Sequence, residues 1–370
     1  MAQRLNVLYN KKPCYDIVIT QGFDELSTEL STLIKEPKKI CIITDTIVEP
    51  LYADTLKHCL SSLYDNICVY AIPAGESNKS LDHIKKIYAY LIQEKFSRKD
   101  LLIALGGGVV GDMTGFVAAT YLRGVDYIQI PTTLLSQNDS SIGGKTGVDF
   151  DGYKNMVGAF KMPLLVYMNL STLSTLDDRQ YFSGFAEVMK HGLIKDAKFY
   201  TWLIENMYEI CERDMNVLEE MIFRSCSIKK AVVEKDPTEQ GDRALLNFGH
   251  TIGHAIEKAK NFEMTHGECI SLGAVAAAFI SWKRNLIGME DYYEIRDMYV
   301  PFNLPISVDN IDPEEILKLT KFDKKAENGT IKFILLNRIG KAIIDNSVTD
   351  DELLAAIKEI YFNEEEGQYE

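Results

Sequence analysis

The sequence predicts an α/β protein in which an N-terminal domain with a largely parallel sheet precedes a mainly α-helical C-terminal domain. Short apolar runs rich in Ile, Val and Tyr alternate with amphipathic stretches through the first half of the chain. Strands separated by helices favour a parallel sheet. After residue 168 the strand pattern stops and long helical periodicities begin. We therefore expect two domains, residues 1–175 and residues 176–370, each long enough for its own core.

Six segments of the first domain have the composition of buried strands. They are residues 15–20, 39–44, 66–73, 101–105, 126–131 and 164–168. The clearest helix between them covers residues 79–95, where apolar side chains recur along one stripe from Leu81 to Leu91. Ligands of such sheets bind at the carboxyl ends of the strands. The segments that follow strands 101–105 and 126–131 are therefore the first candidates for a site.

The second domain is expected to contain helices and one strand pair. The expected helices cover residues 174–191, 198–235, 251–260, 270–286 and 350–361, another helix starts at residue 312, and the strand pair lies around residues 331–345. Residues 270–286 are mostly small or aliphatic, which is typical of a buried helix.

Charge and cysteine usage narrow the class of partner. A net charge of −14 argues against nucleic acid, which requires a broad basic face, so a local cluster of Lys and Arg must hold any anionic substrate. Seven cysteines without a CxxC pair favour free thiols in a reducing cytoplasm. The first residues lack the apolar core of a signal peptide, and every apolar run is too short to span a bilayer. We expect a cytoplasmic protein with no membrane partner.

A glycine-rich segment, residues 106–112 (GGGVVGD), follows the expected strand at 101–105 and satisfies GxGxxG. Glycines there allow a pyrophosphate to approach backbone amides at a helix start. The segment departs from the usual dinucleotide pattern, because no acidic residue ends a clear next strand. Asp45, which ends the upstream strand at 39–44, is an alternative partner for ribose hydroxyls. Taken by itself, a glycine turn that serves only packing is equally consistent with the pattern.

A second polar segment follows the expected strand at 126–131. Its GGKT sequence resembles a phosphate-binding P-loop, but Asp139 stands where that motif requires glycine, which excludes a nucleoside triphosphatase. The segment presents the Asp139 carboxylate and the Lys145 ammonium, with Lys154 and Asn155 close behind. This chemistry suits a phosphorylated, hydroxylated small molecule.

Three of the six histidines lie within residues 247–268. His250 and His254 are four apart, so on a helix over residues 251–260 their imidazoles share one face and can meet one metal ion or one substrate. His266 follows after a short connection. A structural role is the simpler interpretation of each histidine alone, but three together, flanked by glycines, favour a functional site.

Other polar residues of the second domain have two interpretations. Glu187 shares a helix face with His191 and is a candidate oxygen ligand, although a solvated glutamate is the commoner case. Lys229 and Arg243 precede the histidines, and solvated and functional roles are equally consistent with their positions.

Six blocks of the chain, in this order and spacing, resemble the 3-dehydroquinate synthase family of the shikimate pathway. They are GGGVVGDMTGFVAATYLRG, QIPTTLLSQNDSSIGGKTGVD, KNMVGAF, GFAEVMKHG, RALLNFGHTIGHAIE and HGECISLGA. The resemblance covers nearly the whole chain. It implies a homodimeric enzyme whose first domain binds NAD and whose second domain binds substrate and one divalent metal ion, zinc or cobalt.

The resemblance also implies a reaction. A phosphorylated seven-carbon sugar acid, 3-deoxy-D-arabino-heptulosonate 7-phosphate, would be converted to 3-dehydroquinate and phosphate. The family route is transient oxidation by NAD, phosphate elimination, re-reduction, ring opening and an intramolecular aldol reaction.

Carried over position by position, the resemblance assigns three groups of residues. The metal ligands would be Glu187, His250 and His266. NAD would be bound by Asp45, Glu76, Lys79, Gly107, Gly108, Val109, Asp112, Thr132, Thr133, Lys154, Thr172, Leu173, Ser174 and Thr175. Substrate would be bound by Asp139, Lys145, Asn155, Lys229, Arg243, Asn247 and Lys324 (or Lys325), with Arg123 reaching across the dimer interface, while His254 and Glu239 would take part in proton transfer. His254 is then not a ligand, unlike the expectation from spacing alone.

Three alternatives are weighed against this assignment. Sister sugar-phosphate cyclases that form an inosose or a valiolone share the fold, NAD and metal, but the SSIGGKTG and RALLNFGH segments resemble 3-dehydroquinate synthases more closely. A polyol dehydrogenase has no need for the phosphate- and carboxylate-binding set that includes Lys145, Asn155, Lys229 and Arg243. A catalytically inactive NAD or metal sensor predicts the loss of a ligand or a basic residue, and none is missing.

Overall fold

The computed structural model describes residues 2–34, 39–239, 241–322 and 332–362. The chain forms two compact units, Met1–Leu176 with Leu218–Pro237, and Asp177–Val217 with Thr238–Glu370. Helix α8 (Met215–Lys235) passes from the second unit into the first. Its Cys226 thiol donates to the Gln137 carbonyl at 3.4 Å. The segment Leu218–Pro237 therefore packs with the first unit, whereas the division by sequence assigned it to the second.

The first unit contains a seven-stranded sheet whose neighbouring strands are parallel except at one edge. In spatial order the strands are β1 (Gln3–Tyr9), β2 (Lys12–Thr20), β9 (Leu165–Asn169), β6 (Asp126–Pro131), β5 (Leu101–Gly106), β3 (Ile40–Asp45) and β4 (Ile67–Ile72). Only β1 pairs antiparallel, with β2. The predicted α/β class and its largely parallel sheet are confirmed, and all six expected strands are present. Strand β1 was not predicted.

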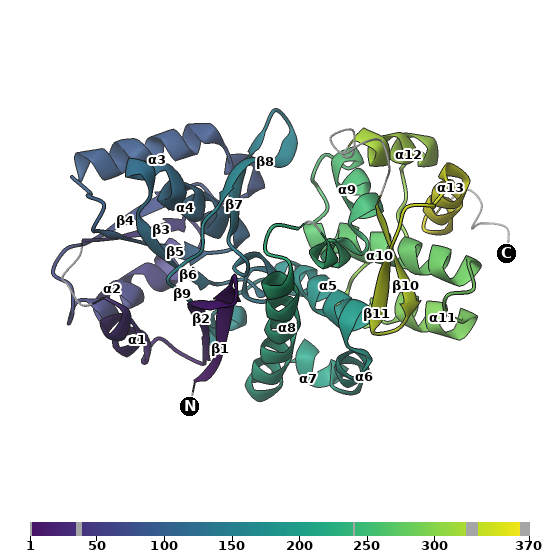
Figure 1. Cartoon of the computed structure of the whole chain (residues 1–370), viewed down its shortest axis with the longest axis horizontal. Coiled ribbons are helices and arrows are strands. Elements are labelled where there is room, and N and C mark those ends of the chain that lie inside the picture. Colours follow the sequence, from purple (N-terminus) through teal and green to yellow (C-terminus); the bar gives the residue numbers. More distant parts are fainter. Residues whose placement is uncertain (1, 35–38, 240, 323–331, 363–370) are drawn as a thin grey trace. The chain divides into compact units, whose positions relative to one another are not determined.

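Helices cover both faces of this sheet (Figure 1). Helices α1 (Leu26–Leu33) and α2 (Asp54–Leu60) share one apolar core with strand residues such as Ile42. Helices α3 (Leu81–Gln93) and α4 (Gly108–Thr120) share the other core with Cys41 and Ile43. Alternate residues of β3 thus enter opposite cores, which explains why the strand is apolar throughout rather than every second residue.

The connections change direction between β3 and β5. From β3 the chain runs through α2 to the edge strand β4, and from β5 it runs through α4 to β6, on the opposite side. Such a point opens a crevice at the carboxyl ends of the two strands, where α/β proteins bind their ligands. In this sheet that point is flanked by the end of β3 at Asp45 and by the glycine segment after β5.

Shorter elements complete the first unit. A separate hairpin consists of β7 (Lys145–Phe150) and β8 (Tyr153–Phe160). One-turn elements are η1 (Glu49–Ala53), η2 (Glu76–Asn78), η3 (Tyr121–Arg123), η4 (Ser136–Ser140) and η5 (Leu170–Ser174). The hairpin packs closely on α4, because a Cβ added at Gly115 would lie 2.3 Å from Thr146.

The second unit is mainly helical. Its helices are α5 (Asp178–Lys195), α6 (Ala197–Glu205), α7 (Met207–Cys211), α9 (His250–Ala259), α10 (His266–Lys283), α11 (Met289–Asp297), α12 (Pro313–Phe322) and α13 (Asp350–Glu359), with the short turns η6 (Asp242–Asn247) and η7 (Val300–Phe302) and the hairpin β10 (Phe333–Arg338) and β11 (Lys341–Asp345). The predicted helical half with one strand pair is confirmed. No described helix is long and apolar enough to cross a membrane.

One predicted helix, residues 198–235, is interrupted in the structure. It is divided into α6, α7 and α8. Arg213 adopts a left-handed conformation with φ of 58°, and the Asp214 carboxylate accepts hydrogen bonds from the amides of Asn216 and Val217 at 3.0 and 3.1 Å. These bonds satisfy amides at the start of α8, so a new helix begins there.

Helix α10 forms the centre of the second unit and is buried on nearly all sides. It starts with a capping box, in which the Glu268 amide donates to the Thr265 hydroxyl and the Thr265 amide donates to the Glu268 carboxylate at 2.7 Å. This cap makes His266 the first helical residue. The expected buried helix at 270–286 is confirmed, and it begins four residues earlier.

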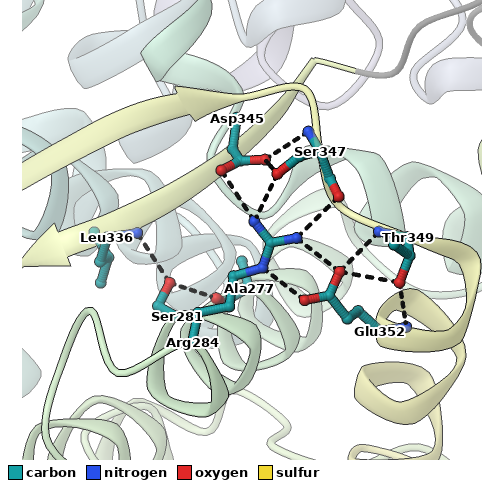
Figure 2. A network of polar contacts seen from close by, with 8 residues as sticks. All are labelled: Ala277, Ser281, Arg284, Leu336, Asp345, Ser347, Thr349 and Glu352. Atoms are coloured by element: carbon teal, nitrogen blue, oxygen red, sulfur yellow. Dashed lines mark hydrogen bonds and ion pairs between the residues drawn. The ribbon is translucent and has the colours of Figure 1, made fainter.

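The other end of α10 is held by an arginine network (Figure 2). The Arg284 guanidinium donates to both carboxylate oxygens of Glu352 on α13, at 2.6 and 2.7 Å, and to Asp345 of β11 at 3.0 Å. One turn earlier, the Ser281 hydroxyl accepts from the Leu336 amide of β10 at 3.0 Å. The hairpin and the last described helix are thereby joined to the central helix.

Candidate active-site residues in the two units

A carboxylate and a glycine turn lie at the carboxyl ends of the neighbouring strands β3 and β5. Asp45 accepts hydrogen bonds from the amides of Ile47 and Val48 through Oδ1, at 2.9 and 3.0 Å, which fixes the carboxylate at the end of β3. Gly107 precedes the first turn of α4. A Cβ added at Gly107 would lie 3.1 Å from the Thr133 methyl group. The glycine turn therefore brings bare backbone to the start of a helix, which suits a phosphate group.

The carboxyl ends of β6 and β9 lie at the same edge of the sheet as those of β3 and β5. The Thr132 amide donates to the Gly106 carbonyl at 3.0 Å. The Thr132 hydroxyl is buried and has no hydrogen-bond partner among the described residues. In η5, Thr172 accepts from the Gln137 amide group at 3.2 Å, and the Tyr52 hydroxyl contacts the Thr175 hydroxyl. An unpartnered buried hydroxyl beside a glycine turn is the expected form of a ligand contact.

The structure thus brings a large part of the predicted NAD set to one edge. Those residues are Asp45, Gly107, Gly108, Val109, Thr132, Thr133, Thr172, Leu173, Ser174 and Thr175, which lie at or after the carboxyl ends of β3, β5, β6 and β9. Their function in binding NAD stays a prediction.

Lys79 is the centre of a second polar group in the first unit. Its buried ammonium donates to Asp112 and to the Asn155 side chain, both at 2.6 Å, and lies 3.9 Å from Glu76. Glu76 also lies 3.7 Å from the Lys154 ammonium. Burial alone would lower the pKa of Lys79, but the carboxylates of Asp112 and Glu76 outweigh it and raise the pKa above its ordinary value. Lys79 is therefore charged at neutral pH.

A third group in the first unit joins α8 to η4. The Lys229 ammonium donates to the Asp139 carboxylate at 2.6 Å and also to the Asp139 carbonyl. Lys229 is nearly buried. Lys145, at the start of β7, is exposed. Arg123 lies in the exposed η3 turn, where both Leu122 and Arg123 have positive φ, 50° and 69°. The predicted substrate residues of this unit therefore come from different elements: Lys145 from the start of β7, Lys229 from α8 and Arg123 from η3.

The predicted metal ligands converge in the second unit. Nε2 of His266 lies 3.2 Å from Glu187 Oε1, and Nε2 of His250 lies 3.5 Å from the same oxygen. Each residue offers one ligand atom, and these atoms all lie within 4.8 Å of one another. Glu187 comes from α5, and the histidines are the first residues of α9 and α10.

Two glycines bring the starts of α9 and α10 together. Gly249, which precedes α9, has a φ of 81° and is left-handed, a conformation that glycine adopts without strain. A Cβ added at Gly273 of α10 would lie 1.8 Å from the Gly249 carbonyl oxygen. The close approach that places His250 beside His266 therefore requires glycine at position 273.

Electrostatics favour a charged carboxylate and a neutral imidazole in this group. Burial alone would raise the pKa of Glu187, but Lys190, its ion-pair partner, and then His250 hold that pKa well below the ordinary value. Burial, followed by the charge of Lys190, lowers the pKa of His250. The Nδ1 atom of His250 lies 3.1 Å from the Phe248 carbonyl, so we assign the proton to Nδ1. Nε2 then keeps its lone pair toward Glu187.

One carboxylate and two imidazoles form the donor set of open zinc and cobalt sites, in which a remaining position is left for substrate. The residues present thus fit a divalent metal ion. His254 belongs to an adjoining group instead: its ring centroid lies 5.1 Å from that of His250 and 6.0 Å from that of His266.

Other predicted substrate residues of the second unit lie near η6. The Asn247 amide group donates to the Glu239 carboxylate at 2.8 Å, and Glu239 has a φ of 61°. Arg243 is buried in the same turn. Lys324 and Lys325 lie outside the described residues.

Comparison with protein families gives two adjoining matches along this chain. Residues 69–183 match the N-terminal domain of 3-dehydroquinate synthase, and residues 184–326 match its C-terminal domain. The chain belongs to the 3-dehydroquinate synthase family. The resemblance inferred from the sequence blocks is thereby confirmed.

Curated 3-dehydroquinate synthases are similar in sequence to this chain over most of its length. The chain is 43% identical to the 3-dehydroquinate synthase of Acetivibrio thermocellus, over 93% of this chain and 95% of the relative. It is 45% identical to the 3-dehydroquinate synthase of Nitrosospira multiformis, over 85% of this chain and 86% of the relative.

Solved structures with the same fold include two sister cyclases. The 2-epi-5-epi-valiolone synthase of Streptomyces hygroscopicus, solved with NAD⁺ and Zn²⁺ bound, superposes with a TM-score of 0.88 at 26% identity, covering 96% of this chain and 99% of that chain. A 2-deoxy-scyllo-inosose synthase, solved with carbaglucose-6-phosphate, NAD⁺ and Co²⁺, gives a TM-score of 0.85 at 25% identity, covering 97% of this chain and 100% of that chain. Glycerol dehydrogenase of Schizosaccharomyces pombe shares the fold at 14% identity and a TM-score of 0.65, over 91% of this chain and 86% of that chain.

For this member of the 3-dehydroquinate synthase family, sequence reasoning missed residues that contact the candidate site, among them Lys190 and Asp149. Lys190 is buried and forms an ion pair with Glu187 three residues earlier on α5. Asp149 accepts from the Asn155 amide at 2.8 Å and donates its own amide to the Lys79 carbonyl at 2.9 Å. The Asp-Gly pair at 151–152 could have indicated the hairpin turn that brings Asp149 and Asn155 to neighbouring strands.

Proposed function

We propose that this protein is a 3-dehydroquinate synthase, which converts 3-deoxy-D-arabino-heptulosonate 7-phosphate to 3-dehydroquinate and phosphate. The observation that carries the proposal is identity of 41–45% with curated 3-dehydroquinate synthases over most of the chain. The residues at the carboxyl ends of β3, β5, β6 and β9 in the first unit and the Glu187, His250 and His266 group of the second support it, because the reaction requires both a redox cofactor and a metal ion.

NAD is the cofactor of the first unit in this proposal. When bound, it supplies the transient oxidation at C5 of the substrate and its reversal. Asp45 would hold ribose hydroxyls, and the Gly107 and Gly108 amides would hold the pyrophosphate at the start of α4. The buried Thr132 hydroxyl, which has no partner in the described part of the chain, would gain one from the cofactor. Lys79 would remain charged beside Asp112 and order the same loop edge.

Glu187, His250 and His266 would hold the metal ion, zinc or cobalt. When bound, the ion polarises the substrate oxygen at the redox centre as a Lewis acid. Lys190 compensates the buried charge of Glu187, and the Phe248 carbonyl fixes the tautomer of His250. His254, beside this group, would act in proton transfer, and Glu239 would be a further acid or base.

Cationic and amide side chains would bind the charged ends of the substrate. Lys145, Asn155 and Asn247 would hold the phosphate, together with Arg123. Arg243 and Lys229 would hold the carboxylate, for which a planar guanidinium and an ammonium are suitable partners. Asp139, the ion-pair partner of Lys229, orients that ammonium. We also assign Lys324 to the substrate set.

The chemistry explains why these groups occur together. Oxidation of the C5 hydroxyl to a ketone acidifies the neighbouring C6 hydrogen, so phosphate leaves by elimination. After the ketone is reduced again, ring opening and an intramolecular aldol reaction close the carbocycle. Because one set of residues serves all the steps, positioning of the substrate contributes much of the rate.

The quaternary state and cellular location are also part of the proposal. We propose a homodimer in which Arg123 reaches the partner's site. Arg123 is exposed in the η3 turn, as a residue that reaches a partner subunit must be, and its positive φ of 69° is uncommon for a residue other than glycine. A cytoplasmic location agrees with the seven free cysteines.

Phosphate release and net NADH, followed together, test the proposed activity. Purified protein is supplied with the heptulosonate phosphate, NAD and zinc. We expect phosphate release without accumulation of NADH, and 3-dehydroquinate as the product. Accumulating NADH without phosphate would instead indicate a dehydrogenase. If neither phosphate release nor NADH is detected, and the protein instead turns over the sugar phosphate of a sister cyclase, it is an inosose or valiolone synthase.

A further inference from the structure

Glu257 is a buried carboxylate that none of the assignments above uses. It lies in the last turns of α9 and is 3% exposed. Its Oε1 lies 3.9 Å from Nδ1 of His266. On the other side of the same ring, Nε2 of His266 lies 3.2 Å from Glu187. The imidazole of His266 is therefore situated between two carboxylates, one for each nitrogen.

The other histidine of the group has the same arrangement. His250 directs Nε2 toward Glu187, at 3.5 Å, and its Nδ1 lies 3.1 Å from the Phe248 carbonyl. In both rings the inner nitrogen faces the shared oxygen of Glu187 and the outer nitrogen faces an acceptor. Metal-binding histidines commonly donate the outer N–H to such an acceptor, which fixes the tautomer and makes the inner nitrogen a better ligand.

The backbone of His266 is fixed independently of its ring. The capping box of Thr265 and Glu268 sets the start of α10, and the Gly267 amide donates to the Ser183 hydroxyl at 2.9 Å. These contacts determine where the Cα of His266 lies, but they leave the ring free to rotate about its side-chain bonds. Glu257 is the acceptor on the outer side that can select one ring orientation.

We propose that Glu257 is a positioning residue that orients His266 through its Nδ1–H and thereby raises the affinity of the Glu187, His250 and His266 group for its metal ion. The inference rests on the proposed metal site. Shortening the 3.9 Å contact by about 1 Å brings the two atoms to hydrogen-bond distance. Glu257 does not touch substrate in this proposal and acts only through His266.

A competing arrangement uses Glu257 as a ligand itself. His254, Glu257 and His266 also offer one ligand atom each within 4.8 Å of one another. A metal ion held by this second set would compete for His266 or add a second ion. The stoichiometry and the spectrum of the bound metal separate this arrangement from the proposed one.

Metal affinity is the first test. Apoprotein is titrated with zinc against a chelator of known affinity, for the unchanged protein and for Glu257→Gln, Glu257→Ala, His266→Ala and Glu263→Gln. We expect one zinc per chain, and affinity about 10- to 100-fold weaker in Glu257→Ala, with a smaller loss in Glu257→Gln, whose amide oxygen still accepts a hydrogen bond. Glu263, exposed in the loop after α9, is the matched control and should leave affinity unchanged.

The cobalt spectrum is the second test, because loss of packing alone would not move it. The visible absorption of bound Co²⁺ reports the geometry of its ligands, so it should shift in Glu257→Ala and return toward the original in Glu257→Gln. Unchanged affinity and spectrum in Glu257→Ala, with metal binding abolished in His266→Ala, would overturn the inference and leave the metal site standing. Zinc binding that persists in His266→Ala would overturn the proposed metal site itself. Two zinc ions per chain, of which Glu257→Ala loses one, would identify Glu257 as a ligand and overturn its role as a positioning residue.

Discussion

At the scale of single residues, variants of the Glu187 and Lys190 ion pair distinguish the role of Glu187 in metal binding from its role in the stability of the fold. Glu187→Gln removes a ligand charge and also leaves the buried Lys190 ammonium without its carboxylate. We expect loss of bound metal and turnover, together with a loss of about 3 kcal/mol in the free energy of unfolding, the usual cost of breaking a buried ion pair.

The double variant tests that explanation. Glu187→Gln with Lys190→Met should recover most of the stability but neither metal nor turnover, because no unpaired charge remains. Urea unfolding and metal analysis provide the two measurements. If the single variant kept its metal, Glu187 would not be a ligand. If the double variant were less stable than the single one, the unpaired Lys190 ammonium would not be the cause of the lost stability.

At the scale of elements, the crossing of α9 and α10 depends on Gly273. A Cβ at that position would lie 1.8 Å from the Gly249 carbonyl oxygen, so Gly273→Ala must push the helices apart. We expect a loss of about 3 kcal/mol in stability and weaker metal binding, because His250 and His266 start these two helices. Gly22→Ala, where the nearest atom to an added Cβ is 3.4 Å away, is the control. Equal stability of the two variants in urea unfolding would contradict the claim that the close approach of α9 and α10 requires glycine at position 273.

The arginine network at the end of α10 gives the second unit a pH dependence. Hydrogen bonds from Arg284 lower the pKa of Glu352 from its ordinary 4.5 to about 2. A lowered carboxylate pKa stabilises the folded state above pH 4.5, and this contribution is lost as the pH falls toward 2. Both side chains are partly exposed, so we expect Glu352→Gln to lose about 1 kcal/mol at pH 7.

Urea unfolding of the original protein and Glu352→Gln at a series of pH values measures this contribution. The difference in stability should be constant between pH 7 and 5 and should shrink between pH 4.5 and 3. A difference that stays the same down to pH 3 would show that the Glu352 charge is not its source.

At the scale of the whole molecule, metal binding should stabilise the fold by mass action. An ion present at 100 times its dissociation constant adds about 2.7 kcal/mol to the free energy of unfolding. We expect a chelator to lower the melting temperature and to stop turnover, and zinc or cobalt to restore both. His266→Ala should melt at the same temperature with and without chelator. A chelator effect that persists in this variant would indicate a different binding site.

The first unit was largely predictable from sequence because its strands are buried on both faces. Continuous apolar runs such as Ile40–Asp45 mark such strands without any knowledge of their partners. The β1 strand was missed, because it lies at the antiparallel edge and only Val7 of it is buried. Local pattern also predicted the helix at 198–235 as one piece, since the break depends on the conformation of Arg213 and the cap of Asp214.

The candidate site was predictable in its residues but not in its contacts. His250 and His254, four apart on α9, indicated a metal pair by spacing, whereas the group around Glu187 includes His266 from another helix. Lys190 and Glu257 carry no local signal, because a charged residue on a helix usually faces solvent. Only the packing of α5, α9 and α10 shows that both are buried.

The return of Leu218–Pro237 to the first unit also has a consequence for biosynthesis. The chain passes between the two units after residues 176, 217 and 237. During translation the first unit cannot be completed until residue 237 has emerged, by which time residues 177–217 of the second unit are already outside the ribosome. N-terminal units usually fold first as the nascent chain lengthens. Here the contacts of η4 with α8, such as that of Asp139 with Lys229, cannot form until residues 218–237 have been made, so the first unit is completed only after part of the second has been synthesised.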